Sequence, residues 1–427
     1  MVDQFYAAIW PVFTLRLTCA GFGTCWRYFP TATALNGPSH MPTIDKIQSF
    51  APDLTALCQD FHQHPEIGFE EHRTSARIAE LLEGWGIQVT RYIGKTGVVG
   101  VLQGTGGAGR TIGLRADMDA LPMEEQTNLP YASKTPGVFH GCGHDGHMTM
   151  LLGAARYLAE NRGFSGRAVF IFQPAEEGLG GARAMLADGL FDRFPCDELY
   201  GMHNSPYSAF GRVSIRPGKA QAGASFFDII VTGRGSHAAM PQASSDPIAI
   251  GAALIGDLQR IVSRNVDPTH PAVLSVTRFN AGTAYNVIPE TATLAGTFRY
   301  LHEEDRALIC ARMEQICAAA EQANDIRIDL DIQNIFGVLS NDPDRTRNLI
   351  EVAGDIVGDA AQPDAGLTMG SEDMADLLNV VPGAFFNLGH HGEVPLHNPG
   401  FIFDDTVLPV GASILARLVE RRGAATD

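Results

Sequence analysis

The sequence predicts a two-domain α/β protein, in which a mixed, mostly parallel sheet with helices on both faces is interrupted by an inserted ferredoxin-like α+β domain. Three observations support this fold class. The chain has 427 residues, which exceeds what one hydrophobic core usually supports. Apolar runs short enough to be buried strands alternate with helical patterns in its first half. A later section has a different order of strands and helices, so we expect one domain to be inserted into another.

The first forty residues differ in composition from the rest of the chain. This segment is aromatic and apolar, but Asp3 stands where a signal peptide favours positive charge, and Pro11 and Arg16 interrupt the apolar run. The segment is also too broken to span a membrane. We expect residues 1–40 to be a spurious extension upstream of a natural start at Met41. A weak targeting segment is the alternative.

The first domain is expected over residues 41–217 and 333–427. Residues 110–122 and 166–178 each predict a short buried strand that runs into a polar loop, with a helix over residues 148–161 between them. This order favours parallel pairing, and functional groups collect in the loops at the carboxyl ends of parallel strands. Four acidic residues occupy those loops: Asp117, Asp119, Glu176 and Glu177.

The inserted domain is expected over residues 218–332. Its strands and helices follow in the order β-α-β-β-α-β, which is typical of a ferredoxin-like module. The expected elements are strand 226–233, helix 246–263, strands 272–282 and 291–301, helix 303–324 and strand 327–334. A helical pattern over residues 346–357 then returns the chain to the first domain.

The glycine-rich segment GTGGAG, residues 104–109, matches the pattern of dinucleotide-binding loops only in part. That pattern needs a helix after its last glycine, whereas an apolar strand follows here. We therefore expect a hairpin-like turn at this segment and no dinucleotide site.

The composition argues against several classes of partner. The formal net charge is −17, whereas affinity for nucleic acid comes mainly from Lys and Arg. The seven cysteines have irregular spacings that do not resemble a disulfide framework. We expect a soluble protein of the cytoplasm, a reducing compartment, that binds neither nucleic acid nor a membrane.

The segment GVFHGCGHDGHMTM, residues 137–150, gathers side chains that bind metals. Cys142 as a thiolate and His144 as a neutral imidazole both bind first-row metals, and the glycines between them let the backbone turn tightly. Either residue alone could equally be a core residue or a solvated loop residue. The remaining candidates make a metal site the better interpretation.

Further ligand-type residues follow predicted strands elsewhere in the chain. Glu176 and Glu177 are adjacent in QPAEEG, His203 lies in GMHNSP, and His397 lies in VPLHNPG. Two adjacent carboxylates at the end of a buried strand cannot both ionise cheaply without a cation nearby. Ligands from so many separate places suit a catalytic site with two metal ions better than one closed tetrahedral zinc.

Eight motifs in order resemble a known family: LRADMDALP, FHGCGHDGH, FQPAEEG, MHN, GRGSHAAMP, NVIPETA, GSEDM and LHNPGF. They resemble the co-catalytic metallopeptidases related to aminoacylase and carboxypeptidase G. More narrowly, they resemble the amidohydrolase branch that contains hippurate hydrolase and the plant hydrolases of indole-3-acetyl amino acids. The resemblance extends from Met41 to the C-terminus.

The resemblance implies a set of metal ligands and a general base. It implies two divalent metal ions per subunit (Zn, Mn, Co or Ni), with Cys142 bridging them. Glu176 would accept the proton of the attacking water and pass it to the leaving amine. The wider family has a metal-ligand histidine where this chain has Arg115, so Asp117 is expected to orient a ligand and not to bind metal. The implied ligands are Cys142, His144, Glu177, His203 and His397.

The resemblance also assigns roles to residues that bind the substrate. His237 resembles a family histidine that enters the active site of the neighbouring subunit and polarises the scissile carbonyl; a surface histidine is the alternative. Asn286 and Arg299 are candidates to hold the substrate's carboxylate, although Arg299 could be an ordinary charge at a strand end. Glu372 is expected either to line the site or to cap the helix after it.

These implications predict a metallo-amidohydrolase whose inserted domain serves as a lid and a dimerisation domain. The expected substrates are N-acyl or N-aroyl amino acids, hippurate-like and including bulky aroyl-phenylalanine amides, and the expected assembly is a homodimer or a higher homo-oligomer. Three alternatives stay open. They are a cysteine hydrolase that uses Cys142 and His144, a metal-binding protein without turnover, and a dipeptidase, carboxypeptidase or deacetylase of the same family.

Overall fold

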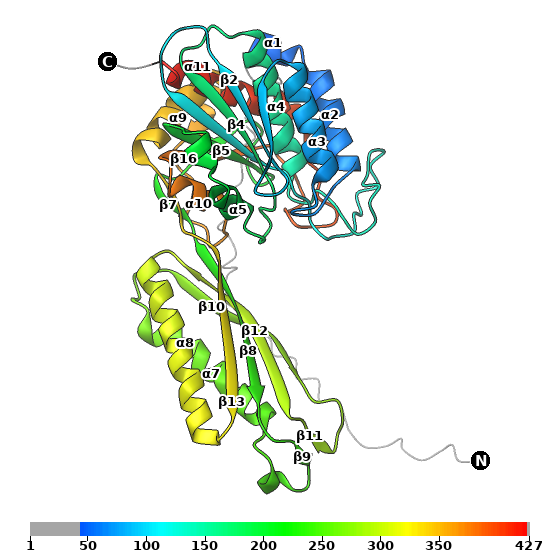
Figure 1. Cartoon of the computed structure of the whole chain (residues 1–427), viewed down its shortest axis with the longest axis vertical. Coiled ribbons are helices and arrows are strands. Elements are labelled where there is room, and N and C mark those ends of the chain that lie inside the picture. Colours follow the sequence, from blue (N-terminus) through cyan, green and yellow to red (C-terminus); the bar gives the residue numbers. More distant parts are fainter. Residues whose placement is uncertain (1–42, 425–427) are drawn as a thin grey trace, which may run out of the picture. The chain divides into compact units, whose positions relative to one another are not determined.

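A large mixed sheet forms the first domain of the protein (Figure 1). The computed structural model describes residues 43–424, so the leader predicted over residues 1–40 lies outside the described residues. In spatial order the strands of this sheet are β1 (Gln88–Ile93), β2 (Gly97–Gln103), β4 (Arg167–Gln173), β3 (Thr111–Asp117), β5 (Glu198–Ser205), β16 (Gly383–Gly389), β6 (Val213–Ser214) and β15 (Ala361–Gln362).

The large sheet is covered by helices on both faces, because successive residues of its strands point to opposite sides. In β4, Phe170 and Phe172 enter one hydrophobic core while Val169 and Ile171 enter another. The first core contains residues of α1 (Asp45–Gln48), α2 (Ala51–Gln63), α3 (His72–Gly84), α4 (His144–Glu160), α9 (Pro343–Val357) and α11 (Leu408–Arg422). The second contains residues of α5 (Gly181–Ala187), α6 (Leu190–Arg193) and α10 (Met374–Leu378).

The centre of this sheet is parallel and one of its edges is antiparallel. β3 runs parallel to β4 and β5, and β5 runs parallel to β16, whereas β1, β2 and β4 pair in antiparallel fashion. The mixed sheet with helices on both faces confirms the predicted fold class. The carboxyl ends of β3, β4, β5 and β16 meet at one edge, which brings distant loops together.

The expected hairpin-like turn at residues 104–109 is wrong. β2 ends at Gln103 and β3 begins at Thr111, but the two strands are not neighbours, because β4 pairs with both of them. The glycine-rich segment therefore crosses the end of a third strand. A local sequence pattern identifies the chain reversal but not the strand that lies between its two arms.

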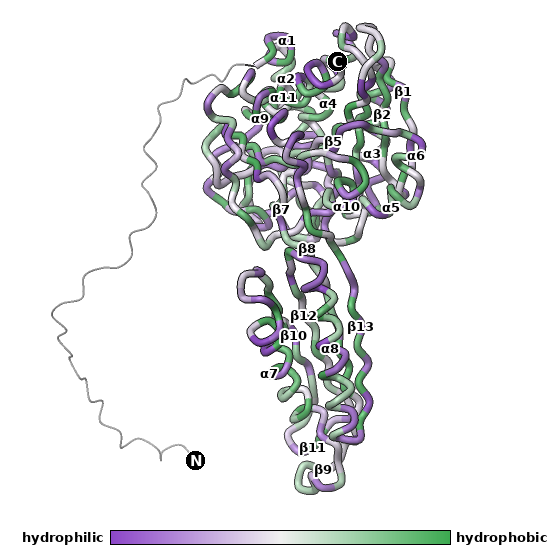
Figure 2. Tube along the Cα trace, turned by 90° about the vertical axis from the view of Figure 1, so that its left-hand side faces the viewer, coloured by the Kyte–Doolittle hydropathy of each residue, from purple (hydrophilic) through white to green (hydrophobic). Residues whose placement is uncertain are grey.

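The inserted section forms a four-stranded antiparallel sheet with two helices on one face (Figure 1). Buried and exposed residues alternate along its strands, and Figure 2 shows the matching alternation of hydrophobic and hydrophilic residues in β13. In chain order the elements are β8 (Gly223–Thr232), α7 (Pro247–Asn265), β10 (Ala272–Ala281), β12 (Thr291–Tyr300), α8 (Glu303–Asn324) and β13 (Arg327–Phe336). This is the predicted ferredoxin-like order, while the domain limits at residues 218 and 332 stay a prediction.

Short elements complete the described part of the chain. Two small antiparallel ladders pair β7 (Gly218–Gln221) with β14 (Leu339–Asn341) and β9 (Ser236–His237) with β11 (Val287–Ile288). Single 3-10 turns lie at Pro241–Ala243, Gly358–Ala360 and Asp405–Val407. Within residues 43–424, no helix has both the length and the apolar character needed to cross a membrane.

Candidate metal centre

The five metal ligands predicted from the sequence lie together at the carboxyl edge of the large sheet. The Sγ atom of Cys142 is 3.4 Å from Nε2 of His203 and 3.3 Å from Nε2 of His397. Oε1 of Glu177 is 3.3 Å from Nε2 of His397 and 4.0 Å from Nε2 of His144. Cys142 thus belongs to two groups of side chains that could each hold a metal ion, one with His144 and His203 and the other with Glu177 and His397.

The cysteine and the first histidine are positioned by the start of α4. The sequence predicted this helix from residue 148, but it begins at His144, so two of the clustered histidines lie in its first turn. Gly143 precedes the helix with a φ of 85°, a conformation that side chains other than glycine rarely adopt. A Cβ atom there would also lie 2.5 Å from the side-chain nitrogen of Asn204.

Hydrogen bonds fix which nitrogen of each ligand histidine is free. Nδ1 of His144 donates to the carbonyl of Asp119 at 2.9 Å, and Nδ1 of His203 donates to the carbonyl of Asn204 at 2.7 Å. Each Nε2 therefore keeps its lone pair, directed into the cluster. Nε2 of His144 is buried and forms no hydrogen bond among the described residues. A buried acceptor without a donor fits a bound cation.

Burial and neighbouring charges shift pKa values in the cluster in different directions. Burial lowers the pKa of His203 to about 4, so its imidazole is neutral, as a ligand must be. Burial, together with the charges of Glu372 and Glu177, raises the pKa of Glu176 well above its ordinary value. Burial likewise raises the pKa of the Cys142 thiol. A set of sulfur, nitrogen and oxygen donors suits zinc and other first-row metals.

Asp117 is placed behind the cluster. Its Oδ1 accepts a hydrogen bond from Nδ1 of His147 at 2.7 Å, and its Oδ2 accepts one from Nη1 of Arg115 at 2.7 Å. Both carboxylate oxygens are therefore engaged. Its nearest approach to a candidate ligand is 3.9 Å, to Nδ1 of His144. This placement suits an orienting residue.

His147 and Asn204 contact the cluster, although no role was predicted for either from the sequence. Nε2 of His147 accepts the backbone N–H of Asn204 at 2.9 Å, so its lone pair is occupied and it is not free to bind metal. The Asn204 side chain donates to the carbonyl of Cys142 at 2.6 Å. Two features of the sequence could have identified them. His147 lies three positions after His144, and Asn204 is the asparagine of the MHN motif.

A cavity of about 730 Å³ opens beside the cluster. Glu176, Arg299 and Glu372 line it together with four of the candidate ligands, and His144 lies behind them. Nη1 of Arg299 donates to the hydroxyl of Ser371 at 2.7 Å, and Arg299 forms no ion pair within residues 43–424. The apolar part of the lining consists of Leu179, Tyr207, Phe226, Phe336 and Leu396.

Both roles considered for Glu372 are compatible with its position. Its Oε1 accepts the backbone N–H of Met374 in the first turn of α10 at 3.0 Å. The same oxygen is 2.9 Å from Nη2 of Arg115, and the residue lines the cavity. Glu372 therefore caps a helix and also lies at the edge of the site.

His237 and Asn286 lie together, but away from the cluster in this chain. His237 is paired with Val287 between β9 and β11, and the carbonyl of Asn286 accepts the N–H of Ala238 at 3.0 Å. This ladder follows the end of β8, whose ten residues span about 33 Å. Neither residue lines the cavity at the metal cluster, and His237 is exposed.

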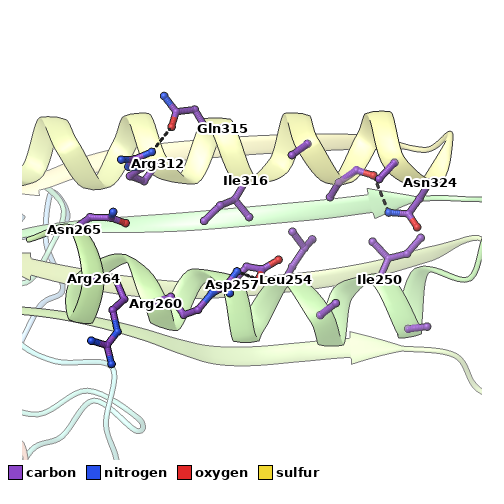
Figure 3. A pocket seen from close by; sticks show the side chains of 15 residues that line it. Ile250, Leu254, Asp257, Arg260, Arg264, Asn265, Arg312, Gln315, Ile316 and Asn324 are labelled. Atoms are coloured by element: carbon purple, nitrogen blue, oxygen red, sulfur yellow. Dashed lines mark hydrogen bonds and ion pairs between the residues drawn. The ribbon is translucent and has the colours of Figure 1, made fainter.

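A second cavity of similar size lies elsewhere, between α7 and α8, with a volume of about 750 Å³. Figure 3 shows Leu254 and Ile316 between the two helices, with Arg264 and Arg312 toward one end. It contains none of the residues that the sequence singled out. The slightly smaller cavity at the cluster is therefore the candidate functional site.

Comparison with known proteins identifies relatives over most of the chain. Residues 113–421 match the family described as peptidase family M20/M25/M40. Hippurate hydrolase from Campylobacter jejuni is 41% identical over 379 residues, which cover 88% of this chain and 98% of that protein. The IAA-amino acid hydrolase ILR1-like 4 of Arabidopsis thaliana is 36% identical over 394 residues, 90% of this chain and 89% of that protein. N-acetyl-L-cysteine deacetylase of Bacillus subtilis is 37% identical over 380 residues, 87% of each chain.

A solved structure of the same architecture is a dinuclear metal binding peptidase of the M20 family from Bacillus subtilis. It matches this chain with a TM-score of 0.75 at 32% identity, and the match covers 88% of this chain and 99% of that one.

Proposed function

The chain belongs to peptidase family M20/M25/M40, as a metallo-amidohydrolase of the amidohydrolase branch, and on this basis we propose that it hydrolyses the amide bond of N-acyl and N-aroyl amino acids. The membership confirms the resemblance seen in the eight motifs. One observation carries the proposal: five ligand-type side chains form one cluster, and four of them line a cavity together with Glu176 and Arg299. Both the substrate and the residue roles below belong to this proposal.

Cys142, His144, Glu177, His203 and His397 would hold two divalent metal ions. When bound, the metals would polarise the scissile carbonyl and lower the pKa of the attacking water toward ~7. Glu176 would take the proton of that water, because its carboxyl lines the cavity directly beside Glu177. Asp117 would hold the ligand loops from behind through His147.

The lining of the cavity offers a cation and apolar side chains, the two kinds of group that an N-acyl amino acid needs. Arg299 has no carboxylate partner in the described structure, so its guanidinium is available for the substrate's carboxylate. Leu179, Tyr207 and Phe226 form an apolar wall that suits an aromatic acyl group. Hippurate, an aroyl amino acid, has both features, and larger aroyl-phenylalanine amides share the same two ends.

His237 and Asn286 would act in the site of a second copy of this chain. Their side-by-side position at the end of the inserted sheet explains why neither reaches the cavity of its own chain. β10 forms an edge of that sheet and exposes Val273 and Phe279, a surface suited to pairing with another chain. We therefore propose a homodimer that forms through the inserted domains.

A substrate screen with metal analysis tests the proposed function. We expect N-benzoylglycine and bulkier aroyl amino acids to be cleaved with higher kcat/KM than N-acetyl amino acids or dipeptides, by protein that holds two metals per chain. Arg299→Gln should raise KM about tenfold or more, because one charge-assisted hydrogen bond is lost. Arg278→Gln is the matched control, since Arg278 pairs with Asp228 on the same sheet. A preference for dipeptides or acetyl substrates would contradict the proposed substrate class.

Cys142 is expected to behave as a ligand and not as a nucleophile. Its Sγ atom lies 3.4 Å from Nε2 of His203 and 3.3 Å from Nε2 of His397, and a cysteine hydrolase would not need these two distant histidines. Chelation should abolish activity, and a divalent metal should restore it. Mass spectrometry under single-turnover conditions should find no acyl group on the protein. An acyl-enzyme at Cys142 would instead establish the cysteine hydrolase.

A further inference from the structure

Arg115 is a fully buried arginine, with 1% of its surface exposed, that contacts both Asp117 behind the metal cluster and Glu372 in the lining of the cavity. Its Nη1 donates to Asp117 at 2.7 Å, and its Nη2 is 2.9 Å from Glu372 and 3.0 Å from Asp373. Nε donates to Gln173 at 2.9 Å. Burial opposes its charge, but Glu372, Asp117 and Asp373 outweigh this and raise its pKa. The guanidinium is therefore a permanent internal cation.

One branch of contacts leads from Arg115 to the metal ligands. Asp117 accepts from Arg115 and from His147, each at 2.7 Å, and His147 accepts the backbone N–H of Asn204 at 2.9 Å. Asn204 follows His203 directly and donates to the carbonyl of Cys142 at 2.6 Å. This branch thus fixes two ligand loops that come from different parts of the chain.

A second branch leads from Arg115 to the cavity. Nη2 of Arg115 holds Glu372, whose other contact is the N–H of Met374. The residue before Glu372 is Ser371, and its hydroxyl accepts the hydrogen bond from Arg299. The segment that orients Arg299 is therefore anchored by the same guanidinium that anchors Asp117.

We propose that Arg115 is a positioning residue. Its Nη1 holds Asp117 behind the metal-ligand loops, and its Nη2 holds Glu372 beside Ser371, the residue that orients Arg299. The inference rests on the ligand set and the Arg299 role proposed above. The planar guanidinium of arginine is essential to this role, because separate nitrogens contact Asp117 and Glu372 in fixed directions. A lysine would keep the charge but could not span both branches.

The test measures both branches in Arg115→Lys. The metal-free protein is titrated with zinc in competition with a chromophoric chelator, and KM for N-benzoylglycine is measured at saturating metal. We expect zinc affinity to fall about 10–100-fold, as is typical when an outer partner of a ligand is lost. We also expect KM to rise about tenfold, the effect of one weakened charge-assisted hydrogen bond.

Two variants separate positioning from general destabilisation. Arg422→Lys is the matched control, because Arg422 pairs with buried Glu198 at 2.8 Å near the start of β5, away from the ligand loops. It should lower the melting temperature and leave zinc affinity and KM unchanged. His147→Leu interrupts the metal branch alone, so it should weaken zinc binding and leave KM at saturating metal unchanged.

Several outcomes would overturn the proposal. One is an Arg115→Lys protein with wild-type zinc affinity and KM, and another is the same losses in Arg422→Lys. If Arg115→Lys does not fold, His147→Leu and Glu372→Gln test the branches singly. The proposal then fails if His147→Leu leaves the zinc affinity unchanged or if Glu372→Gln leaves KM unchanged. A wild-type chain that binds no zinc would overturn the proposed function as well, whereas the outcomes above leave that function intact.

Discussion

Glu176→Gln should lower kcat about 10²–10⁴-fold and leave both metals bound, because general-base catalysis contributes a factor of that size. The amide keeps the volume of the carboxyl and cannot accept the water's proton. Glu176 lines the cavity and lies with His144 and Glu177 in one cluster, but it is not one of the five ligands predicted from the sequence. The measurement combines steady-state kinetics with metal analysis of the purified variant.

The neighbouring carboxylate provides the control for this experiment. Glu177 lies within 3.3 Å of His397, and the substitution Glu177→Gln should lose metal as well as activity. The two adjacent glutamates should therefore give different defects. Substantial turnover in Glu176→Gln, or equal metal loss in both variants, would show that the base is another residue.

His237→Ala should lower turnover about 10²–10³-fold, the usual cost of removing one donor to a developing oxyanion. The effect is expected although His237 is exposed and lies outside the cavity of its own chain. Both metals should stay bound, because none of the five candidate ligands belongs to the inserted sheet. His270→Ala, a substitution elsewhere in the inserted domain, should leave turnover unchanged and serves as the control.

Mixing two inactive proteins decides whether His237 acts between subunits. His237→Ala and Glu176→Gln proteins are dissociated, combined and reassociated, and heterodimers are verified by differential tags. In a heterodimer, one site then carries both lesions and the other carries neither, so half of the heterodimer's sites should work. Verified heterodimers that stay as inactive as either parent would place the action of His237 within its own chain.

The sequence was a good guide to elements with strong periodicity. The strand expected over residues 272–282 and the helix expected over residues 303–324 agree with β10 and α8 almost to the residue. The start of α4 was missed, because glycines and histidines at its first turn have the composition of a loop. The strand between β2 and β3 could not be foreseen, since sheet order depends on tertiary packing.

The ligand-type residues of the site were predictable, because each stands in a short recognisable motif. Cys142 and His144 are recognisable because their residue types and flanking glycines occur within one short segment. The positioning role of Arg115 was not predicted. Its partners Asp117 and Asp373 are 2 and 258 positions away in the sequence and contact it only in the folded protein. Asn286 also gave no sign that it lies beside His237, because their pairing depends on a small ladder of two short strands.

The wide separation of the ligands has a consequence for how the chain matures. Cys142 and His397 are 255 residues apart, so the loop between them must close before they can meet. During synthesis the four earlier ligands emerge first, and the set is complete only when the last central strand, β16, has joined the sheet. Metal uptake would then add to the free energy of unfolding by mass action, about 2.7 kcal/mol at a hundredfold excess over Kd. Bound metal would thus stabilise only those chains in which β16 is already in place.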